Sequence, residues 1–416
     1  MVKANLVSVP TLVESPFIIV TIGGYTFGSY IKGKYKTDGI HQNVTFPNYM
    51  KSLNITKVNG TVNTYTLCFS YQVPQGQDPN LLDKVFSRAA VDRKITLSYG
   101  DWNSPAYIYR EETGIITSVT TNLNMSSSSI DYTVKCTSDA IGLTSTKFKF
   151  PARNAKPSDV LKEMVSNNRY GLKEIFTGMQ NQSKVLASNL IASNDKCVQL
   201  NAQVDVTPLQ YMNYLVSCMI SVNNNNKKSL PNSHYFLTIH DDVNNEFGGT
   251  YFTVKEVIND GAMRNDSSDT YVVDVNYPTD NFVTQFSLTN DQSWSILYEY
   301  SQKIDEEKYS YKINNDGQVV TTYSPSLVRS KVTNDVSPAS SNWWSLMTSF
   351  PIQATLTIKG LTRPSMLMSY VRVNVWFSGG QKHVSSGLYI ITKQEDKIDS
   401  SGYKTTLTLL RIGEDK

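Results

Sequence analysis

Few residues in this chain have the chemistry of an active site, and the histidines number only four: His41, His234, His240 and His383. His240 is followed by Asp241 and Asp242, and an imidazole beside two carboxylates could bind a metal ion or act as a general base. The triplet follows the β-prone run Tyr235–Ile239 and precedes two asparagines, which is typical of a strand that enters a turn. We therefore expect this triplet to be structural. His383 follows two glycines in a predicted hairpin loop and has no partner at metal spacing.

Catalytic motifs give no stronger signal, since the sequence holds no GxSxG elbow, HExxH helix, Walker loop or GxGxxG turn. The stretch 193–196 matches SxxK without its companion motifs. The stretches 260–261 and 314–317 resemble parts of a calcium loop without its ligand spacing, so β-turns are the simpler interpretation. Adjacent acids such as Glu111 and Glu112 would point to opposite faces of a strand, which is poor geometry for a glycosidase pair. The sequence therefore predicts no enzyme, no metal site and no cofactor.

Tryptophans outside the strand-like segments are the remaining candidates for a functional site. Trp343 and Trp344 form the most unusual apolar cluster, and Trp102 follows a predicted turn. Tryptophan is enriched where surfaces are buried between partners, so all three are candidate interface residues. They could equally fold inward, Trp343 and Trp344 as a plug between domains. The sequence leaves both interpretations open.

The composition excludes several classes of protein. With 416 residues the chain exceeds the roughly 250–300 that one core supports, so we expect more than one domain. Charged residues make up 18% and the net charge is +3, which excludes a strongly basic surface for nucleic acid. A hydrophobic fraction of 40% excludes disorder. We find no apolar stretch long enough for a membrane helix and no secretion signal, and we expect the four dispersed cysteines to be free thiols.

A period of two is the main structural signal. From Tyr65 to Val73 every second residue is apolar and the residues between are polar, as a strand with one buried face requires. The same pattern recurs in further segments and predicts strands there, at 95–99, 130–136, 354–358, 371–377 and 403–412. Glycine-containing turn signals separate these segments. The pattern therefore predicts a mainly β protein.

Three segments predict helices, and each begins at a proline. Pro79, Pro157 and Pro208 each precede apolar residues at helical spacing, with Asp78 and Thr207 as predicted caps. Composition then divides the chain into three regions, namely a β-rich region 1–150, a mixed α/β region 151–345 and a strand-rich region 346–416. The last region is short, so we expect it to close a β-barrel that shares strands with the middle region.

Two parts of the sequence repeat each other loosely. Ile115-Ile116-Thr117 is followed by a serine run and then by a strand from Tyr132, while 390–392 is followed by two serines and a strand from Tyr403. A β-run also precedes each part, at 94–98 and 371–377. Any two hairpins in a chain rich in serine and threonine could look this similar. If the repeat is real, the chain contains two related barrels.

The order of these pieces resembles a known family. The strand from Tyr65 leads through the first helix to the segment 93–102, and the helices at Pro157 and Pro208 then precede a closing module. That module consists of four segments, 354–360, 371–377, 386–392 and 402–409. The whole resembles the baseplate hub proteins of contractile-tailed phages and of related contractile injection systems. Around 241–280 and 305–336 no strands match the family, which leaves an insertion undefined.

This resemblance implies a mainly β fold with an α+β middle region, in which two tail-tube-like β-barrel domains accompany an inserted α/β domain. The first barrel would lie in 1–150, and 346–416 would close the second. The resemblance implies a homotrimer whose six barrels form a ring that adapts the sixfold tail tube to the threefold central spike. The implied partners are the tail tube protein, the central spike protein and the tape-measure protein, with genome DNA only in transit. The implied location is the virion, after assembly in the host cytoplasm.

Two other functions remain open. A tail-associated hydrolase would need a carboxylate pair in a cleft, and a host-surface adhesin would need an exposed aromatic platform for sugars. The equivalent hub of a bacteriocin or secretion-type injection particle would share every feature above. The sequence alone does not separate such a hub from that of a phage.

Overall fold

The computed structural model describes most of the chain in separate stretches. These are residues 16–29, 46–47, 49–72, 78–88, 94–101, 110–124, 129–176, 190–222, 233–241, 250–258, 270–275, 283–293, 309–313, 319–323, 349–360 and 366–414. Among them, no helix has the length and apolar character needed to cross a membrane.

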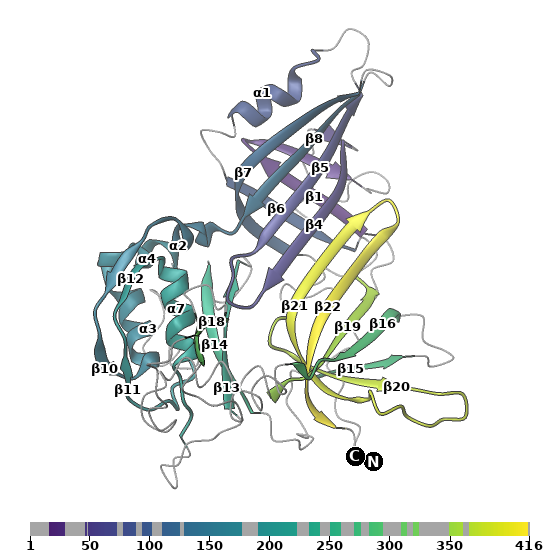
Figure 1. Cartoon of the computed structure of the whole chain (residues 1–416). Helices are drawn as coiled ribbons and strands as arrows, with labels where there is room; N and C mark the ends of the chain where they lie inside the picture. Colours follow the sequence, from purple (N-terminus) through teal and green to yellow (C-terminus); the bar gives the residue numbers. More distant parts are fainter. Residues whose placement is uncertain are drawn as a thin grey trace.

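One 14-stranded sheet dominates the described part of the chain, and it has two halves (Figure 1). The first half-sheet contains eight strands: β1 (Pro16–Ile22), β2 (Tyr25–Ser29), β3 (Phe46–Pro47), β4 (Met50–Val58), β5 (Thr64–Gln72), β6 (Lys94–Asp101), β7 (Arg110–Asn124) and β8 (Ser129–Thr137). The second half-sheet contains six: β15 (Thr270–Val275), β16 (Val283–Asn290), β19 (Ile352–Lys359), β20 (Tyr370–Val375), β21 (Gly387–Asp399) and β22 (Gly402–Glu414). The mainly β prediction is confirmed.

Alternating burial explains why these segments form strands. In β5 four alternate side chains are at most 1% exposed, namely those of Tyr65, Leu67, Phe69 and Tyr71. The residues between them are partly or fully exposed. The same alternation places Ala354, Leu356 and Ile358 of β19 in the core of the second half-sheet. Each half-sheet therefore buries one face, as the period of two predicted.

Two of the predicted alternating patterns of buried apolar residues are interrupted, one because the strand ends and the other because the strand bulges. β20 ends at Val375, so the prediction that Phe377 continues its buried face is wrong. Phe377 lies beyond the strand and is 55% exposed, and its ring meets that of His383 at 5.1 Å. In β22 the register shifts opposite Leu388 and Tyr389, which moves Ile412 to the buried face. The bulge explains why the alternation in this strand is irregular.

The mixed α/β middle region packs beside the sheet (Figure 1). Its helices are α2 (Gly142–Ser145), α3 (Pro157–Ser166), α4 (Leu172–Ile175) and α7 (Pro208–Ser217), with 3-10 turns at Asp139–Ile141 and Asn168–Tyr170. Its strands pair in twos: β9 (Phe148–Phe150) with β12 (Gln203–Val206), β10 (Arg153–Ala155) with β11 (Val198–Leu200), and β13 (Ser233–His240) with β14 (Tyr251–Ile258). β17 (Tyr309–Ile313) and β18 (Val319–Tyr323) form a separate hairpin.

The three predicted helices are present. α3 and α7 begin at the predicted prolines, and Thr207 and Gln210 form a capping box at the start of α7. α1 (Leu81–Arg88) begins two residues later than predicted, because Asp78 caps it through Asn80, whose backbone N–H donates to Oδ1 at 2.9 Å. α2 and α4 are single turns that the helical spacing did not predict.

A tight turn joins the middle region to the sheet. Gly60, between β4 and β5, has a φ of 72° and donates its backbone N–H to Leu237 O at 2.7 Å. Its carbonyl accepts a hydrogen bond from Asn213 Nδ2 at 2.8 Å. An added Cβ would lie 2.7 Å from Asn213 Oδ1, so glycine meets both the φ and the close approach.

The two half-sheets share one five-strand topology. In the first half the pairing order is β4–β5–β8–β7–β6, and in the second it is β16–β19–β22–β21–β20. Within each set the strands follow the same chain order, and every pair is antiparallel. The loose repeat in the sequence is therefore a true structural repeat.

Bulges fall at matching positions in the two sets. β7 shifts register across Thr117, and β21 shifts across Thr392. The hydroxyl of Thr117 donates to Lys135 O at 3.0 Å, and that of Thr392 donates to Thr408 O at 3.3 Å. A second pair of bulges lies in the equivalent strand pairs β4–β5 and β16–β19, at Met50–Ser52 and at Val283–Gln285. The matching bulges therefore define which residues of the two five-strand sets are equivalent.

The sequence predicted two separate barrels, and the observed sheet differs from this prediction in how its ends are paired. Among the described strands, no pairing closes either half-sheet on itself, and β3 and β16 lie at the two ends of the order. The halves are instead continuous through β4 and β21. β15 and β16, which come from the middle of the sequence, pair with β20 and β19.

Candidate functional site

The three predicted interface residues, Trp102, Trp343 and Trp344, lie outside the described residues. They remain predictions. The described part of the chain directs attention to a different place, which is the junction where the two half-sheets meet.

The junction, which we call the seam, is the pairing of β4 with β21. The first part of β21 pairs with β20, but from Lys393 onward β21 leaves β20 behind and pairs with β4, ending at Ile398 opposite Leu53. In Figure 1 β21 and β22 rise from the second half-sheet to lie beside β4. Ile398 and Tyr403 join the hydrophobic core of the first half-sheet. The second half of the chain thus completes the core of the first.

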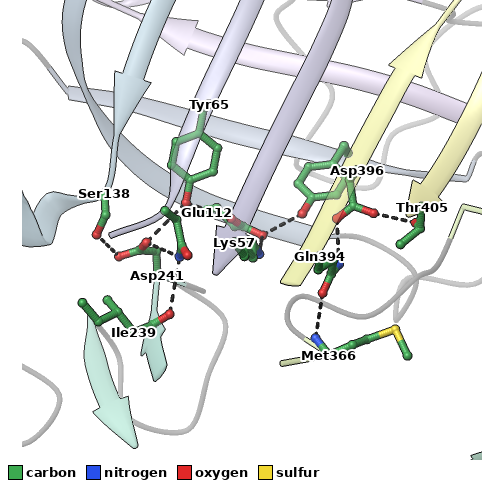
Figure 2. A network of polar contacts seen from close by, with 12 residues as sticks. Lys57, Tyr65, Glu112, Ser138, Ile239, Asp241, Met366, Gln394, Asp396 and Thr405 are labelled. Carbon is green, nitrogen blue, oxygen red and sulfur yellow. Dashed lines mark hydrogen bonds and ion pairs between the residues drawn. The ribbon is translucent and has the colours of Figure 1, made fainter. Parts of the chain in front are cut away.

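A buried ion pair lies beside the seam. Lys57 Nζ contacts Glu112 Oε1 at 2.5 Å, and the two side chains are 3% and 0% exposed. Tyr99 OH donates to Glu112 Oε1 at 2.6 Å, and Tyr65 OH donates to Oε2 at 2.9 Å. The Glu112 carboxylate on β7 therefore contacts side chains from β4, β5 and β6, as Figure 2 shows in part.

The partners of Glu112 determine its charge. Burial alone would raise the pKa of this carboxyl group, but the Lys57 ammonium and the two tyrosine hydroxyls outweigh burial and hold the pKa below its ordinary value. Burial and the neighbouring Glu112 carboxylate raise the pKa of Tyr65 well above its usual range. The group is thus an ionised glutamate held by neutral phenols and one lysine.

A second buried carboxylate extends this network to the middle region. Asp241 follows β13, and it accepts hydrogen bonds from Ser138 Oγ and Asn63 Nδ2, both at 2.6 Å. Tyr65 OH also lies 3.4 Å from Asp241 Oδ2, so one phenol links Asp241 with Glu112. Burial raises the pKa of Asp241 to about 6, although the hydrogen bonds act in the opposite direction.

The predicted His240-Asp241-Asp242 triplet is divided by the structure. His240 Nε2 lies 3.0 Å from Thr253 Oγ1, and its ring stacks on Tyr251 at 4.6 Å. Burial, with a contribution from Lys57, lowers the pKa of His240 to about 3. Asp242 lies outside the described residues. The neutral imidazole and the hydrogen-bonded Asp241 carboxylate support the structural interpretation.

A third buried carboxylate lies on the other side of the seam (Figure 2). Asp396 accepts hydrogen bonds from Thr405 Oγ1 at 2.5 Å, Gln394 Nε2 at 2.7 Å and Tyr403 OH at 3.2 Å. Gln394 in turn accepts the backbone N–H of Met366 at 2.8 Å. These polar groups on β21 and β22 are thus hydrogen-bonded to one another and to the backbone of Met366, so the buried Asp396 carboxylate is satisfied.

The sequence reasoning missed Lys57 and Glu112, although a signal was available. Lys57 continues the alternating buried face of Leu53 and Ile55, and Glu112 begins the face that continues with Ile116. A charged residue in phase with a buried face requires a partner, and the two charges are of opposite sign. Because Glu111 and Glu112 are adjacent, they were considered only as a possible acid pair, and the buried position of Glu112 was not recognised.

The network can act as a structural lock. Glu112, Asp241 and Asp396 are at most 4% exposed, and each accepts several hydrogen bonds from other side chains. Within the described residues no group of three or more potential metal-ligating side chains occurs. Buried, satisfied polar networks rigidify a unique arrangement, so this one fixes how the two halves and the middle region meet.

Comparisons with known proteins give matches only among solved structures. No protein-family model matches the chain. No curated protein sequence matches it either.

Among solved structures, the 43 kDa tail protein of prophage MuSo2 from Shewanella oneidensis is 10% identical, with a TM-score of 0.48 over 95% of this chain and 97% of that one. A tail protein from Neisseria meningitidis MC58 gives the same values. The c3393 protein of E. coli, a component of the type VI secretion system, is 10% identical, with a TM-score of 0.43 over 91% of this chain and 77% of that one. The sequence motifs resemble the same kinds of protein. Because each TM-score is below 0.5, we infer the function from the chain's own strands and contacts.

Proposed function

We propose that this protein is a structural component of a phage tail, and specifically the baseplate hub that joins the tail tube to the central spike. Three copies form a ring, and the two half-sheets of each copy occupy equivalent places in it. The tail tube protein binds one side of the ring and the spike protein the other. The tape-measure protein and the genome pass through the centre.

The duplicated topology carries this proposal. A chain with two equivalent five-strand units presents six such units when it forms a trimer, and six units match a sixfold tube. Among the described elements, those of the middle region have no duplicate, and they keep a threefold arrangement for the spike. We assign the first unit to β4–β8 within the predicted region 1–150, whose residues 139–150 pack with the middle region. We assign the second unit to 346–416 together with β15 and β16 from the middle of the sequence.

The buried network supports a structural role. Its carboxylates are enclosed by the sheet and hydrogen-bonded to tyrosine, serine, asparagine and threonine side chains, an arrangement that holds strands together. The net charge of +3 is also suited to a channel for DNA, because a strongly basic lumen would retain the passing genome. The protein therefore functions in the virion as a non-enzymatic part.

Electron microscopy of the purified full chain tests the proposal, with peptidoglycan turnover measured on the same sample. We expect ring-shaped particles with threefold symmetry, six similar lobes and an open centre, and no turnover of peptidoglycan. Particles without a central channel would contradict the hub. Peptidoglycan hydrolysis that copurifies with the protein would favour the tail-associated hydrolase. A hub from a bacteriocin or secretion-type particle would give the same images, and the neighbouring genes distinguish it.

A further inference from the structure

The seam within the chain is a template for a second seam. β7 and β21 are equivalent strands, as are β4 and β16. The seam joins β21 of the second unit to β4 of the first. Their counterparts, β7 of the first unit and β16 of the second, have no pairing with each other among the described strands. Each has one edge with no ladder partner in the described part of the chain, β7 beyond residue 116.

Apolar side chains on β7 are exposed where their counterparts on β21 are buried. Matching Thr117 with Thr392 places Leu123 at the position of Ile398. Leu123 is 65% exposed, whereas Ile398 is 0% exposed within the core of the first half-sheet. Val119 is 37% exposed, and its counterpart Gln394 is fully buried. β7 thus has the side chains for a seam but no strand covering them in the described chain.

On β16, as on β7, apolar side chains are more exposed than their counterparts at the seam. Matching the bulges places Phe286 at the position of Leu53 and Leu288 at that of Ile55. Leu53 and Ile55 are at most 1% exposed, whereas Leu288 is 37% exposed and Phe286 is only partly buried. Phe286 and Leu288 line a pocket of about 580 Å³. The core of the second half-sheet is therefore open at the place where the seam closes the first.

We propose that β7 of one copy of this chain pairs with β16 of a second copy, antiparallel and in the register of the seam. The seam pairs Ile398 with Leu53, Asp396 with Ile55 and Gln394 with Lys57. The equivalent pairing between copies places Leu123 opposite Phe286, Thr121 opposite Leu288 and Val119 opposite Asn290. Leu123 then enters the open core of the neighbouring second half-sheet, as Ile398 enters that of the first.

The outward faces of the two edges are also compatible. The same register places Asn122 opposite Ser287 and Thr120 opposite Thr289, pairs of small polar residues that can hydrogen-bond across strands. Register is strongly specified where one face is buried, because a slip by one residue would expose Leu123. A second copy of the chain fits these edges because the chain already contains the same joint once.

The pairing has a direction that generates a ring. It joins the first unit of one copy to the second unit of the next, so it is head-to-tail and repeats until the assembly closes. The inference depends on the proposed hub for the number of copies, which is three. It adds the strands, the register and the side chains that hold the copies together.

Engineered cysteines test the register. In a Cys197→Ser background, which removes an exposed thiol, Leu123→Cys combined with Phe286→Cys should give disulfide-linked dimers and trimers on a denaturing gel after oxidation. The matched control combines Phe286→Cys with Val204→Cys, a 52% exposed position on β12 outside both edges. The control should stay monomeric on the gel. Mixing the two single-cysteine variants should give dimers only.

A charge at the same edge tests the interface without cysteines. Lysine on an edge strand opposes pairing, so Leu123→Lys should abolish the trimer while Val204→Lys leaves it intact. Both positions are exposed in the single chain, and unchanged thermal unfolding of the monomers would show that folding is preserved. A wild-type trimer that persists in Leu123→Lys and gives no Leu123–Phe286 cross-link would overturn the pairing and leave the hub standing. A wild-type chain that stays monomeric with and without the spike protein added, and gives no cross-link, would overturn both.

Discussion

The two half-sheets have the same strand topology, but among the described strands only the first has its β4 edge covered by a further strand. The first half-sheet is closed at β4 by β21, which brings Ile398 and Tyr403 into its core. The second half-sheet is open at β16, where Phe286 and Leu288 line a pocket. Under the proposed pairing, one joint is made during folding of the chain and the other by a neighbouring copy.

Polar residues distinguish the two joints further. The Lys57–Glu112 pair lies beside the seam, within the first half-sheet, and the matching positions in the second unit are Asn290 and Gly387. A side chain at Gly387 is excluded, because an added Cβ would lie 2.6 Å from Gly413 O. The intrachain joint thus carries a buried charged lock, whereas the proposed joint between copies is apolar and small-polar. Such an interface should tolerate high salt.

Removing one member of the buried pair should have the largest effect. Glu112→Ala leaves the Lys57 ammonium buried without its carboxylate, so we expect a loss of about 3–5 kcal/mol in the free energy of unfolding. The replacement of both residues together, Lys57→Met with Glu112→Leu, should cost much less. Denaturant unfolding measures both changes. Equal losses in the single and double variants would show that the loss does not come from leaving one buried charge unpaired.

Equivalent apolar residues should respond differently in the two units. Ile398→Ala removes a fully buried side chain and should lower the free energy of unfolding by about 3–4 kcal/mol. Leu123→Ala, at the matching exposed position, should leave the unfolding of the isolated chain nearly unchanged and weaken self-association. Thermal unfolding at low protein concentration, with light scattering at high concentration, separates the two effects. A large loss of monomer stability in Leu123→Ala would contradict the comparison.

The buried aspartate at the middle region should make stability depend on pH. The pKa of Asp241 is about 6 in the folded chain, above the ordinary value of 3.8. A raised pKa means that the stability contributed by the protonated form is fully present below about pH 4 and is lost as the pH rises through 6. This difference is at most about 3 kcal/mol.

The lowered pKa values of Glu112, His234 and His240 act in the opposite direction, so the effect of Asp241 is measured as the difference between wild type and variant between pH 5 and 7. In Asp241→Asn the titrating group is gone, and we expect the difference in unfolding free energy between wild type and variant to change across that interval. A difference that stays constant with pH would show that Asp241 does not titrate there.

The matched bulges should give the smallest and most similar effects. Thr117→Val and Thr392→Val each remove one hydroxyl that donates to a backbone carbonyl on the next strand, while keeping the β-branched shape. We expect each to cost about 1 kcal/mol in unfolding free energy. Chemical denaturation of the two variants in parallel checks this. A change of strand register in only one of them, seen by hydrogen exchange, would argue against the equivalence.

Much of the fold could be predicted from local patterns in the sequence. The alternation around Tyr65 and the proline-led helices depend on neighbours in the chain, so they were visible there. The repeat was visible because Thr117 and Thr392 follow the same pair of isoleucines. The seam was not, because the pairing of Lys57 with Gln394 joins residues far apart in sequence. Glu112 was missed for the same reason, since its partners come from three other strands.

The mass of the full-length protein in solution tests the central claim most directly. Light scattering over a concentration series, at low and at high salt, should show a species of three times the 46.6 kDa chain mass that persists at high salt. The series is repeated with the spike protein added, because in the proposed assembly this partner caps one side of the ring. A strict monomer at every concentration, with and without the spike protein, would contradict the account.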